Sequence, residues 1–235
     1  MSSTSAPRTA RELARAELTR AILDSARKQL AEVGPAALSV RAVARDLGMA
    51  SSATYRYFRS RDDLLTALLI ESYDEVGEAV ERADRCVTDR DDLAGRWRAV
   101  CHAVRGWAVA NPHEYALLYG SPVPGYAAPE ATVPAASRVP LTLLSLTHDA
   151  QRAGRKIGAP ALPVPPAEAD ALAGIRALTD FTISDERLVR SLMAWATLFG
   201  HVSLELFGHM HRGVLDYDTH FTQVVDTLAA DLGLT

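Results

Sequence analysis

Apolar side chains recur every three or four residues along most of this chain, which is the spacing of one buried face of an α-helix. The first such run covers residues 8–33. Gly34 and Pro35 end it, because glycine readily adopts the backbone of a helix C-terminus and proline cannot continue the helix. Its apolar positions are Leu18, Ile22, Ala26, Leu30 and Val33.

Two short helices follow, separated by a glycine. Ser39 is placed to cap the first, which carries apolar residues at helical spacing up to Leu47 and ends at Gly48. The second spans about residues 50–57. Ser60 is then placed to cap a long helix, and acidic residues in its first turn suit the positive end of the helix dipole.

The rest of the chain alternates helical segments with Pro- and Gly-rich loops. Asn111, Pro112 and Glu114 form a helix-start signal of cap, first-turn proline and capping box. Five prolines indicate a loop over residues 121–140. No alternating strand pattern occurs, so we predict an all-α protein of about nine helices. The later helices are predicted at residues 88–107, 111–119, 141–153, 167–178, 184–211 and 218–232.

Charge divides the chain. Residues 1–65 contain eleven Arg and Lys against seven Asp and Glu, whereas the remainder contains fourteen against twenty-two. A basic N-terminal part on an acidic body suggests a polyanionic partner for the former, although an excess this small also arises by chance. We expect a disordered arm at 1–7, a basic N-terminal domain at 8–65 and a larger α-helical domain at 66–235.

The second short helix begins with small side chains, Ala50, Ser51, Ser52 and Ala53. Small residues allow a helix to enter the major groove deeply, where hydroxyls reach base edges. Polar donors flank this helix and suit phosphate oxygens. The direction of Thr54, toward the groove or toward the core, stays open. The flanking donors are Ser39, Tyr55, Tyr57 and Arg61.

Residues 39–65 contain a combination of motifs whose spacings agree with one helix-turn-helix geometry. An unrelated helical hairpin would not be expected to carry all of them. They are Ser39-x-Arg41-x-Val43-Ala44, Leu47-Gly48-Met49, Tyr55-x-Tyr57-Phe58 and Ser60-Arg61-Asp62-Asp63-Leu64-Leu65.

On these motifs the segment resembles the DNA-binding domain of the TetR/AcrR-type transcriptional regulators. The resemblance implies that Ser39 and Arg41 contact backbone or bases, that residues 50–53 read bases, and that Tyr55, Tyr57 and Arg61 anchor phosphates. It also implies that residues 8–65 form a three-helix helix-turn-helix DNA-binding domain and that residues 66–235 form a ligand-binding and dimerisation domain. The implied assembly is a homodimer on double-stranded operator DNA with two-fold symmetry, formed through the helices at about 184–211 and 218–232. A central core helix in a monomer is the alternative.

The body is similar to a TetR subgroup marked by a Trp-His-Gly motif. The matching residues include Trp107, Asn111, Tyr115, Trp195 and Gly200. Aromatic and polar side chains gather in this part of the sequence and predict a cavity for a small-molecule effector, with ordinary core packing as the alternative. The candidate lining residues are His102, Trp107, Tyr115, Tyr119, Phe181, Trp195 and Phe199.

Metal-binding and catalytic motifs have little support in this sequence. His201, Glu205 and His209 have a spacing that could gather a metal, but no cysteine supports them, so we expect no metal and no cofactor. No nucleophile elbow or Gly-rich phosphate loop points to an enzyme. We expect a cytoplasmic repressor, with no membrane contact, that an effector releases from DNA. A DNA-binding architectural protein without an effector is the alternative, and an α-helical enzyme is a weaker one.

Overall fold

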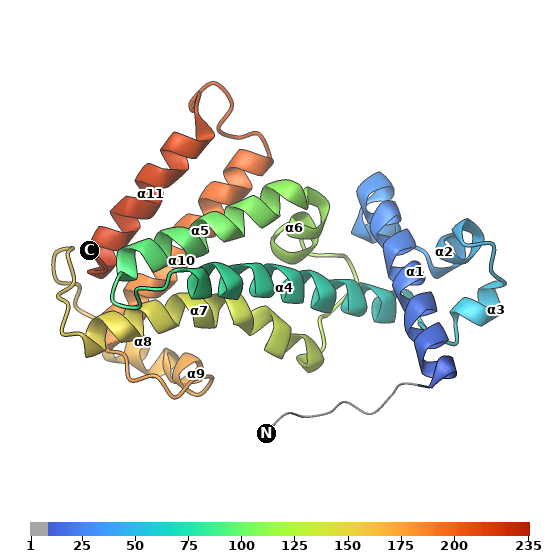
Figure 1. Ribbon diagram of the computed structural model, residues 1–235, viewed down its shortest axis with the longest axis horizontal. Helices are drawn as coiled ribbons and strands as arrows, with labels where there is room; N and C mark the ends of the chain where they lie inside the picture. The colour runs from blue at the N-terminus through green and yellow to red at the C-terminus, as the bar shows by residue number, and fades with distance from the viewer. Residues whose placement is uncertain (1–8) are drawn as a thin grey trace.

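The computed structural model describes residues 9–235, and the predicted arm at 1–7 lies outside that range. The described part is helical without strands. A small head, which contains the first three helices, lies at one end of a larger helical body (Figure 1). The helices are α1 (Ala10–Val33), α2 (Val40–Asp46), α3 (Ser51–Thr54), α4 (Arg61–Cys86), α5 (Leu93–Ala110), α6 (Pro112–Tyr119), α7 (Val133–Arg152), α8 (Pro166–Ala171), α9 (Ala173–Arg176), α10 (Asp185–Leu206) and α11 (Tyr217–Leu232), with single 3-10 turns at Pro35–Ala37 and Glu130–Thr132.

Side-chain caps set the helix starts in the head. Ser39 accepts a hydrogen bond from the backbone N–H of Ala42, and Ser60 accepts one from Asp63, so both predicted caps are confirmed. The second of the two short helices, predicted at about residues 50–57, is shorter than predicted. α3 is one turn ending at Thr54, and residues 55–57 form a turn instead of continuing the helix.

The head has its own hydrophobic core between α1, α2 and the start of α4. Ile22, Val43 and Leu64 are fully buried in it. Leu117 of α6 packs into the same cluster. Because α4 also runs on into the body, the head and body are joined both by a continuous helix and by this apolar contact (Figure 1).

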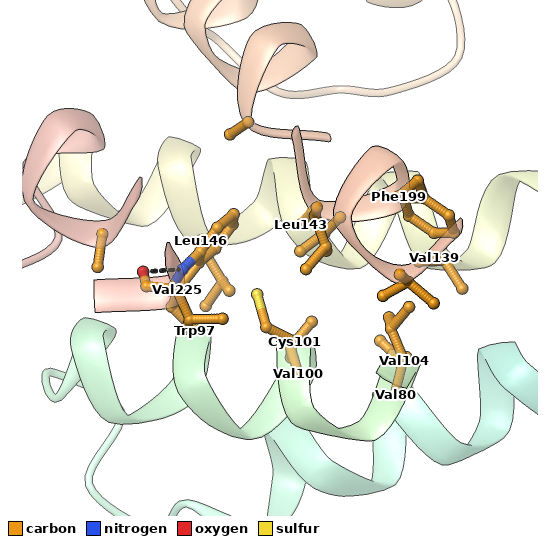
Figure 2. Packing of buried hydrophobic residues seen from close by; sticks show 14 of the residues in the cluster. Val80, Trp97, Val100, Cys101, Val104, Val139, Leu143, Leu146, Phe199 and Val225 are labelled. Carbon is orange, nitrogen blue, oxygen red and sulfur yellow. Dashed lines mark hydrogen bonds between the residues drawn. The ribbon is translucent and has the colours of Figure 1, made fainter. Parts of the chain in front are cut away.

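The body core lies where α5 packs between α4, α7, α10 and α11. Trp97 of α5 is buried there, and its indole N–H donates to the carbonyl of Val225 on α11 at 3.0 Å (Figure 2). Val139 and Leu143 of α7 pack in the same cluster as Val104 of α5 (Figure 2). Burial of these apolar side chains holds the long helices together.

The predicted loop at 121–140 is wrong in its second half, because α7 begins at Val133 and includes Pro140. A proline in the first turn costs nothing, since its missing N–H would have no helical partner. Pro140 removes one interior helical hydrogen bond at a cost of about 3 kcal/mol. The packing of the buried residues on both sides of it, Val139 and Leu143, offsets that cost.

One predicted cap and two predicted helix ranges also differ from the structure. The Asn111 side chain does not cap α6 but donates to the Trp107 carbonyl behind it. The predicted helix at 167–178 divides into α8 and α9 at Leu172, which brings the α-helices to eleven in the described part. The predicted helix at 184–211 ends at Leu206, where turns with positive φ at Gly208 and Arg212 replace the last helical residues.

Among residues 9–235 we found no helix with both the length and the apolar composition needed to span a bilayer.

Candidate nucleic-acid interface

The predicted base-reading residues lie at the surface of the head. Ala50, Ser51 and Ser52 are exposed at the start of α3, and Ala53 is partly exposed. Their side chains are short, so the backbone of α3 forms the foremost part of this surface. The surface can therefore approach another macromolecule closely, as the major groove requires.

Thr54, whose direction the sequence left open, is fully buried at the end of α3 and faces the core of the head. Its hydroxyl has no hydrogen-bond partner within the described residues. Thr54 is therefore a packing residue, and it does not belong to the exposed surface that its neighbours form.

The predicted phosphate anchors surround α3. Tyr55 is exposed, and Tyr57 is partly exposed beneath the guanidinium of Arg15, which lies 5.6 Å from the centre of its ring. This contact adds a cation from α1 to the same surface. Sequence reasoning missed Arg15 and also the exposed Arg56 and Arg59 beside the tyrosines. The excess of basic residues in the first 65 positions was the available signal.

Arg61 has an internal partner as well as partial exposure. Its terminal Nη2 donates to the carbonyl of Pro35 at 2.9 Å, and its Nη1 lies 3.7 Å from Asp62. The side chain thus ties the first turn of α4 to the turn between α1 and α2. It remains accessible beside α3, but it also holds the head together.

Ser39 and Arg41 lie at the start of α2. The Ser39 hydroxyl caps the helix, and its backbone N–H donates to the Gln29 side chain at 3.3 Å. At the other end of α2, Asp46 accepts a hydrogen bond from Ser25 of α1 at 2.7 Å. These bonds fix α2 on α1, so the exposed Arg41 projects from a rigid support.

The structure brings together only some of the predicted effector-binding residues. Tyr115, Tyr119 and Phe199 pack ring against ring, with Tyr119 4.5 Å from Phe199 and 5.1 Å from Tyr115 between ring centres. The Tyr115 hydroxyl donates to the Phe199 carbonyl at 3.0 Å. Burial raises the pKa of both tyrosines. Trp107 packs against the same core.

The remaining candidates lie apart. His102 packs edge-on against Phe221 of α11, and Phe181 stacks on His148 of α7. Trp195 touches Phe199 on one side and on the other lines a cavity of about 300 Å³ between α7, α9 and α10. Sequence reasoning missed this cavity, because its walls are mostly aliphatic residues from distant segments and carry no motif.

His201, Glu205 and His209, the residues whose spacing could gather a metal, do not form one site. Glu205 pairs through both oxygens with Arg105 of α5, and His201 lies buried against the ring of His220. Burial, and then the neighbouring His220, lowers the pKa of His201. Residues 9–235 contain no group of three or more His, Cys, Asp or Glu arranged to hold a metal.

Comparison with known families gives two matches that together span both parts of the chain. Residues 22–68 match the model of the bacterial regulatory proteins of the tetR family. Residues 97–228 match the tetracyclin repressor-like C-terminal domain. The more specific resemblance to a Trp-His-Gly subgroup stays a prediction.

Known relatives and structures agree with these matches. The chain is 42% identical over 211 residues to the HTH-type transcriptional regulators Rv1816 of Mycobacterium tuberculosis and Mb1846 of Mycobacterium bovis, covering 86% of each chain. The crystal structure of the putative regulatory protein SCO4313 is similar with a TM-score of 0.77 at 32% identity, covering 94% of this chain and 98% of that one. A protein of unknown function from Rhodococcus sp. RHA1 is similar with a TM-score of 0.69 at 27% identity, covering 92% and 95%. With its exposed helix-turn-helix and these matches over both parts, the chain belongs to the TetR family of helix-turn-helix transcriptional regulators.

Proposed function

We propose that this regulator is a homodimeric, sequence-specific repressor whose affinity for its operator falls when a small-molecule effector binds the body. The observation that carries the proposal is the exposed start of α3, where small polar side chains stand between tyrosines and arginines. Ser51 and Ser52 face the bases, and Tyr55, Tyr57 and Arg61 contact phosphates on either side. Arg15 reinforces the contact at Tyr57.

The dimer proposal rests on one face of α10. Met193, Ala196, Gly200 and Leu204 are spaced three or four residues apart, and all are exposed in the single chain. Glycine and alanine in such a row allow another helix to approach closely. A second copy packing there, with α11 alongside, removes this apolar surface from water and presents two heads to a two-fold operator.

DNA binding is tested by fluorescence anisotropy with the region upstream of the gene, searched for an inverted repeat. Tyr55→Phe and Tyr57→Phe each remove one hydroxyl, and a lost hydrogen bond of about 0.5–1.5 kcal/mol corresponds to a roughly twofold to tenfold weaker complex. The matched control is Tyr126→Phe, because the Tyr126 hydroxyl is bonded to Thr66 inside the protein at 2.8 Å. Its operator affinity should not change.

The salt and sequence dependence of binding separate the possible outcomes. Specific binding that weakens with salt supports the proposal. Equal binding to unrelated duplexes would instead favour an architectural role. If neither tyrosine variant changes the affinity for the operator, Tyr55 and Tyr57 do not contact phosphates through their hydroxyls.

Dimerisation is tested by sedimentation of Gly200→Arg against Gly106→Arg. A Cβ added at either glycine meets no atom within 4 Å in the single chain, and both positions are exposed, so both variants should fold. Gly200 lies on the proposed interface and Gly106 on the exposed side of α5. We expect Gly200→Arg to sediment as a monomer and Gly106→Arg to behave as the parent protein. If both remain dimers, this face of α10 is not the interface.

A further inference from the structure

The body contains a cavity of about 300 Å³ between three helices, and of the predicted effector-binding residues only Trp195 lines it. α7 forms one wall, Ile175 of α9 and Leu178 just after that helix form another, and Leu188, Leu192 and Trp195 of α10 form the third. Its volume lies at the small end of the range of ligand pockets.

The walls of the cavity are mainly apolar and carry no charge. The polar lining groups are the hydroxyls of Thr132, Ser137 and Ser191 and the indole N–H of Trp195. Each hydroxyl already donates its proton to a carbonyl of its own segment, at 2.8, 2.8 and 2.7 Å respectively. The hydroxyl oxygens can still accept a hydrogen bond. An anionic ligand would therefore lose its hydration without gaining a cation, because the walls offer it only a neutral donor at Trp195.

The cavity is separate from the proposed dimer face. Leu188, Leu192 and Trp195 point to one side of α10. At about 100° per residue, the row from Met193 to Leu204 is turned from them by roughly 120° on average, and Ala196 is its nearest member. A second copy seated on that row would leave the cavity open to a small molecule.

We propose that this cavity is the effector site and that it takes a neutral, mainly apolar small molecule. This inference rests on the proposed ligand-responsive function and specifies its ligand class. The apolar walls supply the affinity by burying the ligand surface, and Trp195 offers an aromatic face at the opening.

The position of the site couples ligand binding to the head. Ala136, Ser137 and Pro140 line the cavity from α7. Arg138, between them in sequence, reaches the other way and binds both oxygens of Glu81 on α4, at 2.8 and 2.9 Å. A ligand that displaces α7 therefore displaces a residue clamped to α4, the helix that begins in the head.

The test uses a matched pair of fluorescent probes with the full-length protein. N-phenyl-1-naphthylamine is neutral, and 8-anilinonaphthalene-1-sulfonate has the same aromatic body with a negative charge. We expect the neutral probe to bind the parent protein at least tenfold more tightly than the sulfonate. Energy transfer from tryptophan to the probe should fall in Trp195→Phe while the affinity is kept.

Two lysine variants locate the site. Leu192→Lys places a cation at the mouth of the cavity, and Val109→Lys places the same cation on α5, outside both the cavity lining and the proposed dimer face. Both residues are exposed, at 40% and 50%, so both variants should fold. We expect Leu192→Lys to weaken the neutral probe at least tenfold and to favour the sulfonate, and Val109→Lys to change either affinity less than twofold.

Equal effects of the two lysine variants would overturn the assignment, as would tight binding of the sulfonate to the parent protein. Probe binding that appears only in the Gly200→Arg monomer would show that a second copy covers the cavity, which also overturns it. Operator binding is measured separately. If the operator binds but the probe does not, the site proposal alone fails, whereas probe binding without operator binding contradicts the repressor function.

Discussion

Thr54→Val should stabilise this protein without changing its affinity for DNA. Thr54 is fully buried and its hydroxyl has no partner in the described part of the chain. An unpaired buried hydroxyl costs about 1–3 kcal/mol. Valine has nearly the same shape and replaces that hydroxyl with a methyl group. We therefore expect the free energy of unfolding to rise by about 1–2 kcal/mol.

The assay is thermal unfolding followed by circular dichroism, with operator affinity measured on the same samples. For a chain of this size, a gain of about 1–2 kcal/mol raises Tm by roughly 2–8 °C. Because the side chain points away from the exposed surface of α3, the Kd for the operator should stay within about twofold.

The matched control is Thr147→Val in α7. Thr147 is also buried, at 1% exposure, but its hydroxyl donates to the Leu144 carbonyl at 2.9 Å. Removing that bond should lower the free energy of unfolding by about 1 kcal/mol. A lower Tm for Thr54→Val, or a weaker operator complex, would refute the reasoning that Thr54 is an unsatisfied core residue.

Three other predictions concern helix contact, pH and the head. A Cβ at Gly77 would lie 2.7 Å from the Cβ of Arg138, so Gly77→Ala should destabilise the protein by about 1–3 kcal/mol in urea unfolding. Gly106→Ala, where a Cβ meets nothing within 4 Å, should stabilise it by up to about 1 kcal/mol. Burial lowers the pKa of His201, so the unfolded chain binds the proton more readily. Stability should then fall as the pH drops below 6.5, level off below the folded-state pKa, and fall less in His201→Leu. Arg61→Met should increase hydrogen exchange in the head even without DNA, and unchanged exchange would show that its bond to the neighbouring turn is unimportant.

Much of the head follows from local sequence. Ser39 and Ser60 cap helices because a hydroxyl there reaches a free backbone N–H three residues on, which needs no distant partner. The spacing of apolar residues similarly predicts α1, α4 and α11. Ser51, Ser52 and Tyr55 are exposed, and their assignment as DNA contacts from the helix-turn-helix pattern stays a prediction.

Local signals failed where packing outweighed them. Pro140 and its neighbours suggested a loop, but burial of the adjacent residues holds them in α7. Asn111 looked like a cap, yet its amide turned back to Trp107.

The sequence alone determined the helical class and the helix-turn-helix, because periodicity, caps and glycine breaks act within a few residues. Only the tertiary structure decided that Thr54 faces the core, that Arg61 bonds the Pro35 carbonyl, and that a neutral cavity opens between α7, α9 and α10. Those features depend on which distant surfaces meet. The energy of burying a side chain or leaving a void belongs to the assembled fold and has no local pattern in the chain.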